Sequence, residues 1–68
     1  MLTKSELQMA VLLLRHATGN VQWASTLFFG VGDSATSARL KDIVARLTDE
    51  VKAIDALIPS APDQGGRA

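Results

Sequence analysis

The sequence predicts an all-α fold, an antiparallel hairpin of two long helices. Two apolar series predict it, because each keeps the alternating spacing of three and four residues that places side chains on one face of a helix. A short stretch with two glycines separates the series and is typical of a turn. The first series is Leu7, Ala10, Leu14, Ala17, Val21, Ala24 and Phe28, and the second is Leu40, Val44, Leu47, Val51, Ile54 and Ile58.

The first helix is expected to run from about residue 3 to residue 29. Thr3 and Glu6 have the spacing of a capping box, which places the start of the helix at Thr3. Gly19-Asn20 in the middle of this segment is typical of a helix end, so two interpretations stay open, a break or kink at the pair and a continuous helix. The apolar series keeps its phase across the pair, which favours the continuous helix.

Residues 30–34 are expected to form the turn, because Gly30 and Gly32 can take left-handed conformations and either Asp33 or Ser34 can cap the next helix. The second helix is expected over about residues 34–58, where Pro59 ends it. Helices of about 25 residues are just under 40 Å long, and their matched lengths favour an antiparallel hairpin domain over residues 1–59. The polar, Pro- and Gly-rich residues 60–68 are expected to be a disordered tail.

A single hairpin of this size leaves apolar surface uncovered. A 68-residue chain buries only about 60% of its unfolded surface, and this one has no cysteine and a single histidine, so neither disulfides nor a structural zinc site supplements the core. We therefore expect two hairpins to form a homodimer like a four-helix bundle, of unspecified orientation. The expected hairpin and dimer core is Leu7, Leu14, Val21, Phe28, Leu40, Val44, Leu47, Val51, Ile54 and Ile58.

A second stripe follows the first helix, about 100° around the helix from the first series. It comprises Met9, Leu13, His16, Asn20, Trp23 and Leu27. Two interpretations stay open, a seam between two copies and a surface for another protein, because Trp and Met are frequent interface anchors. The residues expected to contact a partner protein are Met9, Leu12, Arg15, His16, Trp23 and Phe29.

The sequence offers no constellation for catalysis. His16 has no acidic residue three or four positions away, the chain has no cysteine or tyrosine, and Gly30-Val31-Gly32 is too short for a phosphate-binding loop. We therefore expect no enzyme activity, no cofactor and no metal site.

Charge and hydropathy bear on the remaining partners. Seven Lys and Arg balance seven Asp and Glu, which gives no electrostatic case for nucleic acid or for an anionic membrane. The most apolar window, residues 9–31, holds Arg15 and His16, which argues against a bilayer span. The N-terminus lacks the pattern of a secretory signal, so a cytoplasmic location is expected.

The expected function is that of a small homodimeric helical protein that binds another protein and modulates or inhibits it, like regulators of phages and other mobile elements. A structural coiled-coil subunit of a larger assembly is one alternative. The layout of two heptad-bearing helices, a short turn and alanine alternating with large residues also resembles the plasmid RNA-binding helical hairpin Rop. This resemblance of shape implies RNA or DNA binding, for which the first helix offers Lys4, Gln8, Arg15, Gln22 and Thr26.

Overall fold

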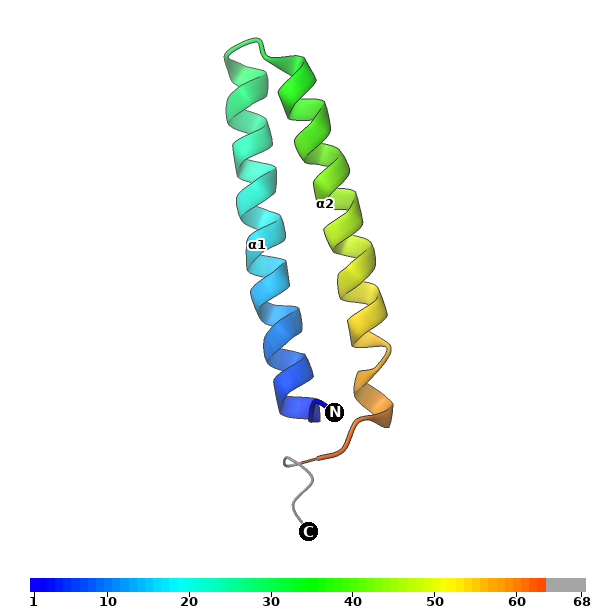
Figure 1. Ribbon diagram of the computed structural model, residues 1–68. Coiled ribbons are helices and arrows are strands. Elements are labelled where there is room, and N and C mark those ends of the chain that lie inside the picture. Colours follow the sequence, from blue (N-terminus) through cyan, green and yellow to red (C-terminus); the bar gives the residue numbers. More distant parts are fainter. Residues whose placement is uncertain (64–68) are drawn as a thin grey trace.

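The structure, a computed structural model, describes residues 1–63 of the chain. It contains helix α1 (Lys4–Gly30), helix α2 (Ser34–Asp55) and a short 3-10 helix, η1 (Ile58–Ser60). The two long helices lie side by side and antiparallel, joined by a short turn (Figure 1). The predicted all-α helical hairpin is thereby confirmed, and its assembly into a four-helix bundle stays a prediction.

Helix α1 is continuous through Gly19 and Asn20. It begins with a complete capping box, in which the Thr3 side chain accepts a hydrogen bond from the Glu6 amide at 3.1 Å. In return the Thr3 amide donates to the Glu6 carboxylate at 2.9 Å. Both bonds satisfy amides that have no partner inside the helix, so the start of α1 is well defined.

The turn ends one helix and starts the next within three residues. Gly32 has a φ of +86°, and its amide donates to the Phe29 carbonyl at 3.0 Å while the Asp33 amide donates to the Phe28 carbonyl at 2.9 Å. These are the two bonds of a Schellman motif. The Asp33 carboxylate then accepts from the Thr36 amide at 3.0 Å as the N-cap of α2. This bond favours the charged carboxylate and holds the pKa of Asp33 below its ordinary value.

The core between the helices is thin. Among the described residues, the only buried large apolar side chains are Leu7, Val11 and Val51, each still 5–7% exposed. Near the turn the helices meet through Ser25 and Ser37, each 2% exposed. The Ser25 hydroxyl donates a hydrogen bond to the Ser37 carbonyl at 3.0 Å. Because this bond uses the only proton of the Ser25 hydroxyl, the Ser37 hydroxyl is the donor in the second bond, in which the two Oγ atoms are 2.9 Å apart.

The face that α1 turns toward α2 differs from the first apolar series. Val11 and Ser25, which the series omits, are buried, whereas Phe28 is 41% exposed. Allowing about 100° per residue, this face is rotated by about 65° from the series. Of the ten expected core residues, Leu7 and Val51 are buried and Phe28 is exposed. The other seven are partly buried: Leu14, Val21, Leu40, Val44, Leu47, Ile54 and Ile58.

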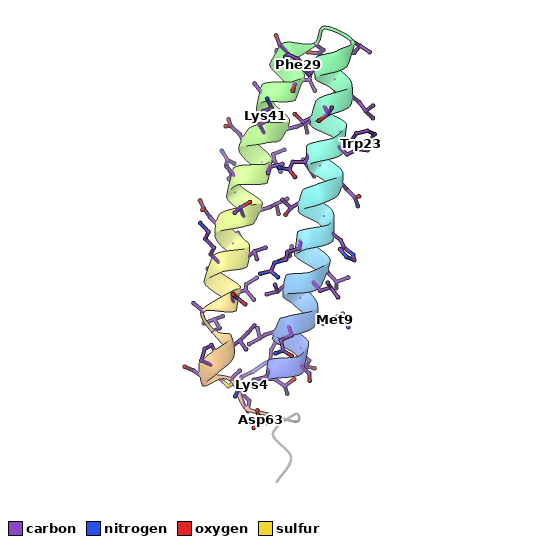
Figure 2. The ribbon with its side chains drawn as sticks, turned by 180° about the vertical axis from the view of Figure 1, so that it is seen from behind. Lys4, Met9, Trp23, Phe29, Lys41 and Asp63 are labelled. Carbon is purple, nitrogen blue, oxygen red and sulfur yellow. The ribbon has the colours of Figure 1, made fainter. Side chains whose placement is uncertain are left out.

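Helix α2 ends at Asp55, earlier than the expected residue 58. Pro59 explains this, because its ring clashes with the carbonyl four residues earlier in an α-helix, which is that of Asp55. The chain continues through η1, and the Pro62 carbonyl accepts a hydrogen bond at 2.9 Å from the Lys4 amide. Lys4 also pairs with Asp63, their charged atoms 3.5 Å apart (Figure 2).

Residues 60–63, expected within a disordered tail, are therefore held against the start of α1. The carbonyl of Pro62 supplies a partner for one of the amides that a helix N-terminus leaves unpaired. The rest of that expectation, residues 64–68, lies outside the described residues.

Candidate interaction surface

Large apolar side chains are exposed mainly on α1. Seven of them lie on this helix, whereas Ile43 is the only one on α2 within residues 1–63. We call seven residues of α1 the outer face, namely Met9, Leu12, Leu13, His16, Asn20, Trp23 and Leu27, all of them exposed. Figure 2 shows Met9 and Trp23 pointing away from α2.

The outer face lies on the opposite side of α1 from α2. With the buried face centred near Val11 and Ser25, its residues fall about 180° around the helix, allowing about 100° per residue. Trp23 is accordingly 65% exposed. Helix α2 cannot cover this face without losing its own contacts to α1, so the hairpin alone leaves it in water.

The exposed apolar area of α1 is large for so small a chain. The exposed fractions of its seven large apolar side chains add up to roughly four whole side chains, on the order of 800 Å². Roughly 600 Å² of it lies on the outer face, and the rest belongs to Phe28 and Phe29 at the end of the helix. Apolar patches of several hundred Å² on soluble proteins mark interaction sites.

A second exposed apolar cluster lies at the turn. We call Phe28, Phe29 and Val31 the turn patch, and all three are exposed. The Lys41 ammonium lies 5.8 Å from the centroid of the Phe29 ring, within the range of a cation–π contact (Figure 2). The turn patch therefore combines apolar surface with a positive charge from α2.

A groove follows one side of the hairpin between α1 and α2, and we call it the polar groove after the charged and polar side chains that line it beside apolar ones. Three shallow hollows form it, and successive hollows share Gly19, Gln22 or Arg15 among their lining residues. Helix α2 contributes Lys41 and Lys52 to this groove, and Asp55 lies at its end. Four of the five residues considered for nucleic-acid contact line it, namely Gln8, Arg15, Gln22 and Thr26.

The six residues expected to contact a partner are all exposed, but they do not form one patch. Met9, Leu12, His16 and Trp23 belong to the outer face. Arg15 lines the polar groove, and Phe29 lies beside Lys41 at the turn. Val31, which sequence reasoning assigned only to the turn, is among the most exposed apolar residues of the described chain.

Two kinds of feature are absent from residues 1–63. No three His, Cys, Asp or Glu side chains of this part of the chain are grouped to hold a metal ion. No helix there combines the length and the apolar character that crossing a bilayer requires. Comparison of the chain with protein-family models, with curated proteins and with solved structures gave no match.

Proposed function

We propose that this protein is a homodimeric helical module that binds another protein and modulates or inhibits it by covering part of its surface. The single observation that carries the proposal is that α1 exposes large apolar side chains on two surfaces that the hairpin leaves uncovered, the outer face and the turn patch. Trp, Met and Phe are the residue types that anchor protein interfaces, and all three are exposed on this helix.

The proposed contact with the other protein is the turn patch together with the adjoining end of the polar groove. Phe29 supplies an aromatic anchor, and Lys41 beside it supplies a positive charge. Trp23 and Lys41 line the same hollow, and Arg15 lies further along the groove. A partner that fits this surface has an apolar patch with acidic residues at its rim.

A homodimer presents two copies of the turn patch related by a two-fold axis. A partner that is itself dimeric is then engaged twice, and the second contact forms at a high effective concentration. Binding of this kind inhibits by occlusion and needs no catalytic residue.

The experiment is affinity capture of the tagged protein from its native host, with two matched variants. Phe29→Ala removes the proposed anchor, and Ile43→Ala removes an exposed apolar side chain of α2 as the control. We expect one protein to be retained in a saturable manner by the wild type and by Ile43→Ala. Loss of a hot-spot residue weakens binding by roughly 30-fold or more, so Phe29→Ala should release it. Equal retention by Phe29→Ala, or no retained protein, contradicts the proposal.

Nucleic-acid binding is a second candidate, favoured by the cations of the polar groove. Arg15, Lys41 and Lys52 line connected hollows, an arrangement suited to following a phosphate backbone. In that case binding of RNA or DNA should fall steeply with salt and weaken in an Arg15→Gln, Lys52→Gln double variant. Capture that is insensitive to salt argues for the protein partner.

A further inference from the structure

We propose that the outer face of α1 binds the outer face of a second copy, with the two α1 helices antiparallel about a two-fold axis. The inference rests on the dimer in the proposed function and specifies its seam and its orientation. It leaves the turn patch and the α2 side of the polar groove open, whereas Trp23 and Leu12 of the outer face also line the α1 side of the groove.

The spacing along the outer face is the same in both directions. From Met9 to Leu27 the central residues are separated by four, three, four, three and four positions. Two antiparallel copies therefore align residue by residue along this face. In each facing pair, the residue number in one copy and the residue number in the other add up to 36. The resulting layers are Met9 with Leu27, Leu13 with Trp23, and His16 with Asn20, each formed twice.

In this register apolar residues face apolar residues, and polar residues face polar residues. The four outer layers are apolar, and the two central layers bring a His16 imidazole near an Asn20 amide, which can donate to it and accept from it. In heptad terms every layer joins an a position to a d position, as antiparallel coiled coils require.

Other arrangements of the same two faces match less well. A parallel pair places His16 against His16 and Asn20 against Asn20, and it crowds two Trp23 indoles into one layer. Sliding an antiparallel pair by one heptad places His16 against Leu13 or Leu27, which leaves a polar group facing an apolar one. The self-matched antiparallel register is thus the favoured one among those the outer face can form.

Charge and area also fit a second copy. The outer face has no acidic residue, lysine or arginine, and the chain has no net charge, so two copies meet without strong repulsion. The five large apolar side chains of this face expose roughly 600 Å² per copy, about 1,200 Å² for the pair, which is within the range of specific interfaces. A hairpin with three buried apolar residues needs such added burial, and a second copy is always present.

Cysteine cross-linking tests the orientation, because the native chain has no cysteine. Met9→Cys and Leu27→Cys are prepared as separate variants and joined with a short bis-maleimide. We expect a mixture of the two to yield a cross-linked dimer and each variant alone to yield none. In an antiparallel pair, residue 9 of one copy lies about 27 Å along the helix from residue 9 of the other.

Self-cross-linking of each variant means a parallel pair, and no cross-link in any sample means that the outer face is not the seam. Either result overturns the inference and leaves the capture experiment on Phe29 unaffected, so the two proposals fail separately.

Light scattering at micromolar concentration gives a second, independent test. We expect the wild type to have about twice the 7.2 kDa mass of one chain. Trp23→Glu places a carboxylate against Leu13 and should weaken the dimer at least 30-fold, whereas the control Gln22→Glu, on the polar groove, should keep it. A monomeric wild type overturns the inference, as does a Trp23→Glu variant that stays dimeric.

Discussion

Removing one hydroxyl of the Ser25–Ser37 pair should destabilise the hairpin more than removing both. Both side chains are 2% exposed, and their Oγ atoms are 2.9 Å apart. Ser25→Ala deletes the acceptor of the Ser37 hydroxyl and leaves that buried donor without this partner, at a cost of about 1–3 kcal/mol. The double variant Ser25→Ala, Ser37→Ala leaves no orphaned hydroxyl and keeps the small volume that lets the helices approach. Its cost should not exceed that of Ser25→Ala alone.

The measurement is thermal unfolding followed by circular dichroism. In a domain of this size about 1 kcal/mol shifts the midpoint by roughly 4–8 °C, so Ser25→Ala should unfold several degrees below the wild type. All variants are compared at one protein concentration, because a dimer's stability depends on it. Ser5→Ala, at an exposed serine of α1, is the control and should change little. Additive costs in the double variant, or a Ser25→Ala midpoint equal to that of Ser5→Ala, refute the reasoning.

The further predictions concern the two helix caps and the glycines of α1 and the turn, and they use the same assay. Thr3→Ala removes the side chain of the capping box and should cost about 1 kcal/mol, and an unchanged midpoint contradicts this role. Gly32→Ala should cost roughly 1–2 kcal/mol because φ is +86° there, whereas Gly19→Ala should stabilise α1 by roughly 0.5–1 kcal/mol, since nothing lies within 4 Å of an added Cβ. The folded-state pKa of Asp33 is lowered, so its contribution is complete above the ordinary value of 3.8 and is lost as the pH falls through the lower folded-state value. Asp33→Asn keeps an N-cap, and its midpoint should therefore fall less between neutral and acid pH than that of the wild type.

The sequence was sufficient for the two helices and their antiparallel pairing, because helix signals are local. The capping box at Thr3 and the unbroken phase of the apolar series across Gly19 both involve residues within one helix. At Gly19 the cost of a glycine, about 1 kcal/mol, is small against the packing of a helix of 27 residues.

The rotation of α1 was beyond sequence reasoning, because it depends on contacts between the helices. A search for large apolar residues passes over Ser25 and Ser37, whose small, hydrogen-bonded side chains are buried between the helices near the turn. In this arrangement Val11 is buried and Phe28 is exposed. The same limit applies to residues 60–63, since the bond from the Lys4 amide to the Pro62 carbonyl joins the two ends of the hairpin.

Charged residues are distributed unequally between the two helices. Helix α2 carries eight of the charged residues, whereas α1, although longer, carries three. Lys4 and Glu6 of these three are engaged at the start of α1, which leaves Arg15 as the one charged residue in the body of the helix. A helix that is apolar around most of its circumference is stable only when it is covered on more than one side. One side of helix α2 covers α1, and the other side of α2 faces water. The opposite side of α1 is therefore the place where a second chain adds most to stability, and a change there should alter assembly before it alters the hairpin.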